Sequence, residues 1–299
     1  MKEIPEFLEK LLIEQYGNEL TNKIIDGYSK KRIVTLRVNT IKSNKDKIKQ
    51  VLDNLNILYE EVSWYNDALV IKNALEKDLI ELDIYKNGEI YLQSLSSMIP
   101  ALVLNPKEGE IILDMASAPG GKTTQTVALS NNKALITACE KNKIRADRLK
   151  YNLNLQGANR VGVIVNDARH LDDFLTFDKI LLDSPCSGSG TLLISDDLNN
   201  KISEDLVKRS SNIQLELIRK AIKLLKLNGE LVYSTCSILK SENEDIIKKV
   251  LKDGKVELVP IDKDSFSDIP LLPCDLSETL LVCPTYFYEG FFVAKLRKK

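Results

Sequence analysis

The sequence predicts an α/β protein with a mostly parallel sheet and a smaller α/β domain ahead of it. From Gly109 onward, short apolar runs alternate with longer segments of helical character, which is typical of βαβ units. The first of these runs, residues 111–113, leads through Asp114 into a glycine turn and a helix-compatible segment. With 299 residues, the chain is long enough for one large and one small domain.

Residues 1–90 are expected to form the smaller domain. Apolar side chains recur at helical spacing over 5–28, and β-branched residues alternate with others over 33–40, as in a strand. A lysine-rich helix and two strand-like runs follow, over 44–55, 59–64 and 68–71.

This domain carries a cluster of basic residues that has two interpretations. The cluster is either the solvated face of a helix and its surroundings, or a patch that neutralises RNA phosphates. Its members are Lys30, Lys31, Arg32, Arg37, Lys42, Lys45, Lys47 and Lys49.

The larger domain is expected over 91–299, after a connecting strand and helix within 88–104. The last strand follows its predecessor without room for a crossover helix, so it should pair antiparallel. The expected strands cover 111–115, 134–139, 161–166, 179–183, 229–235, 256–259 and 290–296. The expected helices cover 121–130, 142–156, 203–226 and 241–252.

Composition narrows the class of protein. The 42 basic and 43 acidic residues nearly balance, so any contact with RNA must come from local clustering. No apolar stretch is long enough to span a membrane, and no signal-peptide pattern opens the chain, so we expect a cytoplasmic protein without a membrane partner. Five cysteines do not resemble a disulfide framework, and a single histidine, His170, argues against a metal site and against Cys–His or Ser–His hydrolysis.

The glycine turn at 116–122 fits a loop that binds a nucleotide-like cofactor. It nearly matches the phosphate-binding pattern G-x-x-x-x-G-K-[ST], but Ala116 stands where the first glycine belongs. The alternatives are the first loop of an S-adenosylmethionine-dependent methyltransferase and an ordinary strand–helix turn. The loop alone does not decide between them.

Acidic residues lie at the carboxyl ends of four of the expected strands: Asp114, Glu140, Asp167 and Asp183. Ligands of open α/β sheets bind at the carboxyl ends of the strands. Glu140 follows the glycine turn by about 20 residues, the spacing at which an acid meets ribose hydroxyls, and Asp167 could accept a hydrogen bond from an adenine amino group. Each acid alone could be a helix cap, but together they favour an adenosine-containing cofactor.

Two cysteines also follow strands, Cys186 in DSPCSGSG and Cys236 in YSTCS. Both are expected beside the cofactor loop. A buried cysteine is usually an inert small hydrophobe, which is our interpretation of Cys139, and we expect Cys274 and Cys283 to be structural.

The motifs DMASAPGGKT, LLDSPCSGSG and VYSTCS resemble those of RNA cytosine-5 methyltransferases of the Sun/Fmu type (RsmB/RsmF-like, Nop2/Sun). The stretches LRVNT, YLQSLSSMIPALVL, SENE and EGFFVAKLRK resemble the same family, in the same order along nearly the whole chain. The resemblance implies a class I methyltransferase fold, Rossmann-like, with a mostly parallel seven-stranded sheet. A P-loop hydrolase would share only the first loop.

The resemblance also implies residue roles. Cys236 would attack C6 of cytosine, Cys186 would assist release of the methylated product, and Asp183 would bind the N3/N4 edge and adjoin the cofactor. Glu140 would hold the cofactor's ribose and Asp167 its adenine. The remaining residues expected to contact S-adenosylmethionine are Ala116, Ser117, Ala118, Pro119, Gly120, Gly121, Lys122 and Arg145. DNA cytosine methyltransferases use the Pro-Cys cysteine as nucleophile, so spacing leaves an inverted assignment open.

The implied partner is RNA, either rRNA or tRNA with a slight preference for rRNA, and we expect a monomer. The chain departs from the family at 192–201, which is rich in Asp and Asn, and around Pro284, Tyr286 and Tyr288. Both regions are candidates for RNA contact. A different class of function, a catalytically idle RNA-binding or ribosome-assembly factor with the same fold, is disfavoured by the presence of both Cys186 and Cys236.

Overall fold

The computed structural model describes residues 4–194 and 198–299 of the chain. They form two compact units. The first comprises Met1–Arg32, Asp173–Thr176 and Leu182–Lys299, and the second comprises Ile33–Asp172 and Phe177–Leu181. The expected division into 1–90 and 91–299 stays a prediction, since contacts alone define these units.

The second unit contains a small antiparallel sheet with the strand order β2-β3-β1-β4. Asn44 caps the N-terminus of helix α2, because its side chain accepts a hydrogen bond from the backbone N–H of Lys47. Ile48 and Leu52 lie on one face of α2 and pack into the core with Leu36. The elements are β1 (Val34–Val38), α2 (Lys45–Asn54), β2 (Tyr59–Glu61), β3 (Ala68–Ile71), α3 (Glu76–Leu79), α4 (Asp83–Lys86) and β4 (Ile90–Leu92). The predicted strands and helix of this domain are confirmed.

Parallel strands form the other part of the second unit, in the order β8-β5-β6-β7. In register, Asp114 lies opposite Ala138 and Cys139 opposite Ile164, so the carboxyl ends of β5, β6 and β7 share one edge. The elements are α5 (Leu95–Leu104), β5 (Ile111–Asp114), α6 (Gly121–Leu129), β6 (Leu135–Cys139), α7 (Lys143–Leu155), β7 (Val161–Ile164), the short helix η1 (Ala168–His170) and β8 (Phe177–Asp183).

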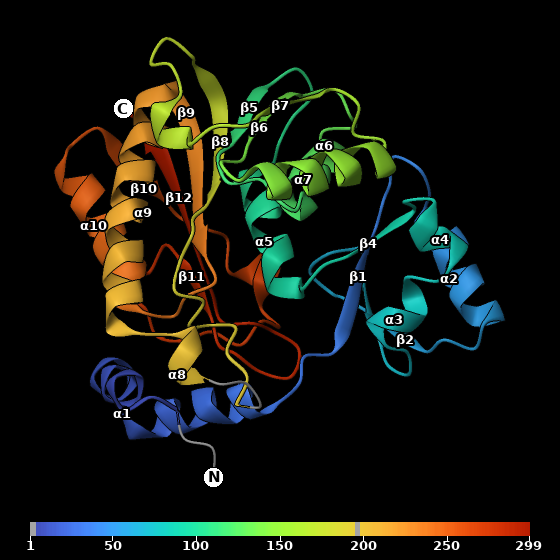
Figure 1. Cartoon of the computed structure of the whole chain (residues 1–299), viewed down its shortest axis with the longest axis horizontal. Coiled ribbons are helices and arrows are strands. Elements are labelled where there is room, and N and C mark those ends of the chain that lie inside the picture. Colours follow the sequence, from blue (N-terminus) through green and yellow to red (C-terminus); the bar gives the residue numbers. More distant parts are fainter. Residues whose placement is uncertain (1–3, 195–197) are drawn as a thin grey trace. The chain divides into compact units, whose positions relative to one another are not determined.

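In the first unit, β12 pairs antiparallel with β9, β10 and β11. Helix α9 packs against β9, and α10 packs against α9 and β10 (Figure 1). The elements are α1 (Glu6–Ser29), α8 (Leu198–Lys201), α9 (Glu204–Leu224), β9 (Leu225–Thr235), η2 (Lys240–Glu242), α10 (Glu244–Lys252), β10 (Val256–Val259), η3 (Asp264–Phe266), β11 (Leu280–Val282) and β12 (Phe291–Lys298). The predicted antiparallel pairing of the last strand is confirmed.

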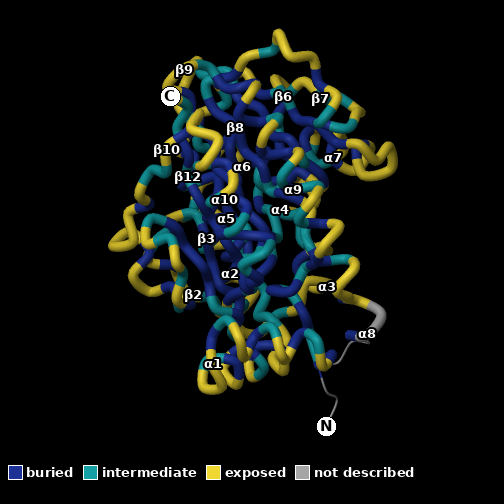
Figure 2. The backbone as a smooth tube through the Cα atoms, turned by 90° about the vertical axis from the view of Figure 1, so that its left-hand side faces the viewer, coloured by how far each residue is buried: buried dark blue, intermediate teal, exposed yellow. Residues whose placement is uncertain are grey.

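Strand β8 connects the two sets of strands, because its residues up to Leu181 belong to the second unit and Leu182 and Asp183 to the first. The main path of the sheet is β10-β12-β9-β8-β5-β6-β7, which confirms the expected seven strands, and β11 adds an eighth beside β12. Figure 2 shows buried residues gathered along the strands and exposed residues on loops and outer helix faces. Among the helices of the described ranges, none combines the length and apolar character needed to cross a membrane.

Candidate active site

The two predicted cysteines lie together in the first unit. Cys186 is in the loop after β8, Cys236 follows β9, and their Sγ atoms are 3.1 Å apart. Both are free, partly exposed thiols. The loops that carry them are joined by backbone hydrogen bonds, from Ser184 N–H to Ser234 O at 2.8 Å and from Gly190 N–H to Cys236 O at 2.9 Å. The structure thus brings these two cysteines together, while their roles stay predictions.

The surroundings of Cys186 disfavour its thiolate form. The hydrogen bond with the Cys236 sulfur, burial, and the negative charges of Cys236 and Glu242 raise the pKa of Cys186 well above its ordinary value. Cys186 is thus held in the protonated form beside its neighbour. Because the thiolate is the nucleophilic form, this environment suits Cys186 to carrying a proton.

Asp183 stands at the end of β8, ahead of the Cys186 loop. Its Oδ1 accepts a hydrogen bond from the Ser234 hydroxyl at 2.7 Å, and the side chain is partly exposed. One carboxylate oxygen is thereby oriented by β9. This arrangement suits an acid that binds a polar edge of a substrate.

Two glycines fix the Cys186 loop against β12, a feature that the sequence analysis missed. Gly290 N–H donates to Gly190 O at 2.8 Å, and a Cβ on Gly190 would lie 2.0 Å from Gly290 O. Only glycine allows the two backbones to approach this closely. Helix α1 adds a second restraint, because the buried Tyr28 hydroxyl donates to Ser189 O at 2.5 Å.

The predicted cofactor loop lies in the second unit and is ordered by Asp114. The buried Asp114 carboxylate accepts hydrogen bonds from the Thr123 hydroxyl at 2.7 Å and from Ala116 N–H at 3.4 Å. Ser117 N–H donates to Cys139 O at 3.0 Å, which attaches the loop to β6. Gly120 has a φ of 111°, so the turn into α6 requires glycine there.

Side chains from neighbouring helices hold the outer part of this loop. From α7, Arg145 Nη2 donates to Ala118 O at 2.7 Å and Asn152 donates to Pro119 O at 2.8 Å. Lys122 Nζ donates to the Ser97 hydroxyl of α5 at 2.7 Å. Gly121 begins α6, so its N–H is one of the unpaired donors of a helix start.

The acids after β6 and β7 provide acceptors at the same edge. Glu140 is buried, and its Oε1 accepts from Asn142 N–H at 2.8 Å while Oε2 lies 3.8 Å from Arg145. Asp167 accepts from Arg169 N–H, Nε and Nη2 at 2.7–3.0 Å, and these bonds lower the pKa of Asp167 to about 2. Buried and charged oxygen acceptors beside a glycine turn fit the hydroxyl-rich ribose and the amino group of an adenosine-containing cofactor.

The predicted basic patch is corrected in one respect, because Arg37 is fully buried. Its Nη2 donates to the Thr124 hydroxyl of α6 at 2.9 Å, and its Nε donates to the Gln93 side-chain oxygen at 3.1 Å. Arg37 therefore holds α6 through a buried hydrogen bond. Four of the lysines pair with acids: Lys30 with Asp26, Lys45 and Lys49 with Glu61, and Lys47 with Glu89. These pairs favour the solvated-face interpretation over a phosphate-binding patch.

Of the two regions that depart from the family, the first is only partly described. In the segment 192–201, Ser195, Asp196 and Asp197 lie outside the described residues. In the C-terminal region Tyr286 is 43% exposed and Tyr288 is buried. RNA contact by these regions stays a prediction.

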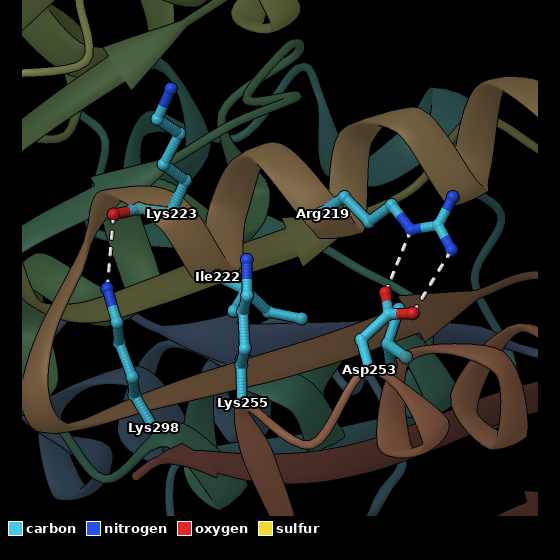
Figure 3. A pocket seen from close by; sticks show the side chains of 7 residues that line it. Arg219, Ile222, Lys223, Asp253, Lys255 and Lys298 are labelled. Carbon is cyan, nitrogen blue, oxygen red and sulfur yellow. Dashed lines mark hydrogen bonds and ion pairs between the residues drawn. The ribbon is translucent and has the colours of Figure 1, made fainter.

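A separate pocket of about 840 Å³ in the first unit contains no predicted site residue (Figure 3). Arg219 hydrogen-bonds Asp253, Lys298 donates to Lys223 O, and Lys223 also pairs with Asp173. Of the four basic side chains that line the pocket, Arg219, Lys223 and Lys298 therefore already have a hydrogen-bond or ion-pair partner. The lining consists of Arg219, Ile222, Lys223, Val250, Asp253, Lys255 and Lys298.

Two family models match the chain. One, described as 16S rRNA methyltransferase RsmB/F, matches residues 101–297. The other, described as a ferredoxin-like domain of RsmF/B-like methyltransferases, matches residues 4–77.

Two solved structures are similar along nearly the whole chain. A methyltransferase homolog protein from Pyrococcus horikoshii has a TM-score of 0.83 and 29% identity, with 99% of this chain and 100% of that chain covered. NSun6 from the same organism, crystallised with SFG, has a TM-score of 0.87 and 25% identity, with 98% of each chain covered.

Three similar proteins are described as RNA methyltransferases. The tRNA (cytosine(49)-C(5))-methyltransferase of Pyrococcus abyssi is 32% identical, with 97% of this chain and 96% of the relative covered. The probable ribosomal RNA small subunit methyltransferase B of Bacillus subtilis is 30% identical over 99% of this chain, and the ribosomal RNA small subunit methyltransferase F of Shewanella amazonensis is 36% identical over 89%. The chain spans 66% and 58% of the lengths of these two bacterial relatives. Because the first of these family models matches more than half of the chain, the chain belongs to the RsmB/F methyltransferase family.

Proposed function

We propose that this chain methylates C5 of a cytosine in RNA through a covalent adduct between Cys236 and C6. The observation that carries the proposal is the thiol pair, Cys186 and Cys236 with 3.1 Å between their Sγ atoms, in a chain of this family. Relatives described as acting on cytosine C5 of tRNA support the same reaction.

The reaction needs a nucleophile because C5 of cytosine is itself weakly nucleophilic. Addition of the Cys236 thiolate to C6 makes C5 enamine-like, and Asp183 would hydrogen-bond the N3/N4 edge and stabilise this adduct. After methylation a base removes the C5 proton, the C6–S bond breaks, and Cys236 leaves. Cys186, whose raised pKa keeps it protonated, would assist this release.

S-adenosylmethionine, when bound, would supply the electrophilic methyl group that C5 accepts. The loop from Ala116 to Lys122 would cradle it, with Glu140 at the ribose, Asp167 at the adenine, and Arg145 and Asp183 as neighbours. The buried carboxylate of Glu140, attached to Asn142 through one oxygen, supports this assignment. The relative crystallised with SFG has the same fold at 25% identity.

The proposed substrate is rRNA or tRNA, of which we slightly favour rRNA. We propose that the protein is cytoplasmic and monomeric. The target base must leave any stack before a thiol can reach C6, at a cost of a few kcal/mol, and the cost is smallest in a loop. Single-stranded or locally opened RNA is therefore the expected form of the substrate.

The test is nucleoside mass spectrometry after incubating the protein and labelled S-adenosylmethionine with tRNA and rRNA pools from cells that lack the gene. We expect labelled 5-methylcytidine in one pool, which would also identify the substrate class. A labelled nucleoside of another kind would contradict the two-cysteine mechanism. Cofactor binding without label in either pool would favour the assembly-factor alternative.

A further inference from the structure

The carboxylate of Glu242 is fully buried and connects the two loops that carry the thiols. Its Oε1 accepts a hydrogen bond from Ser187 N–H at 2.8 Å, and its Oε2 accepts from the Ser187 hydroxyl at 2.6 Å. The same Oε2 accepts from the Ser237 hydroxyl at 2.5 Å. Ser187 directly follows Cys186 and Ser237 directly follows Cys236, so one carboxylate joins the residues next to both thiols.

Glu242 is itself held in place from two further elements. Gln214 of α9 donates its Nε2 to Glu242 Oε1 at 3.2 Å and to Pro185 O at 2.9 Å. The hydroxyl of Tyr233, on β9, donates to the backbone carbonyl of Glu242 at 2.6 Å. Four hydrogen-bond donors at one buried carboxylate match the number an ionised acid accepts, and they offset the cost of removing the charge from water.

We infer that Glu242 is a positioning residue that holds the Cys186 and Cys236 thiols close enough to act in sequence on one base. The inference rests on the proposed function, because it explains how attack and release could use two thiols at one site. Glu242 acts through Ser187 and Ser237 and itself contacts no sulfur by a hydrogen bond among the described residues. A purely structural acid would contribute to folding without setting the distance between the thiols.

The distance between the thiols can be measured by their rate of cross-linking, without RNA or methyl donor. Hydrogen peroxide oxidises one thiol to a sulfenic acid and releases water, and the second thiol displaces a further water from that sulfur to form the disulfide. Overall, two thiols and one peroxide give one disulfide and two waters. A disulfide bond is about 2.05 Å long, so sulfurs 3.1 Å apart need little movement to react. The Cys186–Cys236 disulfide is quantified by peptide mass spectrometry after alkylation of the remaining thiols.

The main variant is the double substitution Ser187→Ala with Ser237→Ala. It removes both hydroxyl groups that donate to Glu242 and changes the side-chain volume little. The matched control is Ser184→Ala, in the same loop, whose buried hydroxyl has no hydrogen-bond partner among the described residues. We expect the double variant to cross-link at least about tenfold more slowly, since misplacement by 1 Å can cost about 10²-fold in rate. The control should stay within about twofold, and thermal unfolding of each variant reports whether it is folded.

Substitution of the acid itself gives a graded readout. Glu242→Gln keeps the length and one acceptor oxygen, and its amide can donate to the two serine hydroxyls, so it should cross-link within about threefold of the wild-type rate. Glu242→Ala should lose at least about tenfold. In methylation assays kcat should fall in the double variant while KM for RNA changes little, because the binding groups remain.

Three results would overturn the inference. The double variant could cross-link at the wild-type rate, the wild-type protein could form no Cys186–Cys236 disulfide, or cross-linking could fall while kcat stays unchanged. Because cross-linking requires neither RNA nor S-adenosylmethionine, failure of the positioning role is distinguished from failure of methyl transfer itself.

Discussion

Substitution of Gly190 by alanine should strongly destabilise the first unit. A Cβ at this position would lie 2.0 Å from Gly290 O and 2.5 Å from Gly290 C. Non-bonded carbon atoms are most favourably placed at about 3.5–4.0 Å, so the two backbones must separate by more than 1 Å. The contact is between main-chain atoms, and no side-chain rotation can relieve it.

The cost follows from what the separation breaks. Gly190 N–H donates to Cys236 O at 2.9 Å, and Gly290 N–H donates to Gly190 O at 2.8 Å. Each hydrogen bond contributes about 1 kcal/mol, and residual overpacking costs about 1–3 kcal/mol. Gly190→Ala should therefore lower the free energy of unfolding by about 3–5 kcal/mol.

The assay is urea unfolding followed by circular dichroism, with the free energy extrapolated to water. The control is Gly162→Ala, on β7, where the nearest atom to a new Cβ is at 4.0 Å and the backbone does not require glycine. This control should be neutral or stabilising by about 0.4–1 kcal/mol, because alanine reduces the entropy of the unfolded chain. The reasoning is refuted if the two variants differ by less than about 1 kcal/mol.

Three further predictions concern the chemistry and the electrostatics. Cys186→Ala should accumulate a covalent protein–RNA adduct on denaturing gels, while Cys236→Ala should show neither adduct nor methyl transfer; an adduct with Cys236→Ala would reverse the two roles. Glu140→Ala should weaken binding of S-adenosylmethionine by at least about tenfold, or about 1.4 kcal/mol, in titration calorimetry, and unchanged affinity would remove Glu140 from the cofactor site. Arg169→Ala should restore the pKa of Asp167, now about 2, toward its ordinary value. Because the folded-state pKa is depressed, the stabilisation is present above the unfolded-state pKa of about 3.9 and is lost as pH falls toward 2. Because the pair is partly exposed and solvent screens it, the variant should be less stable at neutral pH by at most about 1 kcal/mol in urea titrations, and a constant deficit down to pH 2 would contradict this origin.

The placement of Cys186 and Cys236 after two strands was predictable, although 50 positions separate them in the sequence. Each follows a short apolar run that is typical of a buried strand, and ligand-binding residues of open α/β sheets collect where the strands end. The same logic predicted that Asp114, Glu140 and Asp167 would follow successive parallel strands. These features depend on local periodicity and on the sheet edge, and both can be inferred from sequence.

Other features depend on partners that the local sequence does not indicate. Strand β11 has only three residues, Leu280–Val282, and exists because β12 pairs with it. Arg37 looked like one cation of a surface cluster, but its partner Thr124 lies 87 positions away, and only the folded chain brings the two together. Charged side chains are almost never fully buried without such partners, so surface exposure was the reasonable expectation.

Glu242 shows how the resemblance and the geometry complement each other. The stretch SENE was one of several that resemble the family, yet nothing in its composition distinguishes an exposed helix-start acid from a buried one. Its donors come from the loops after β8 and β9 and from α9, and the stretches LLDSPCSGSG and VYSTCS supply Ser187 and Ser237. The close approach of Gly190 to Gly290 likewise joins LLDSPCSGSG to EGFFVAKLRK. Within the first unit, motifs that are distant in sequence are therefore parts of one hydrogen-bonded support around the thiol pair. A substitution in SENE or at Gly290 should accordingly alter thiol chemistry without touching a cysteine.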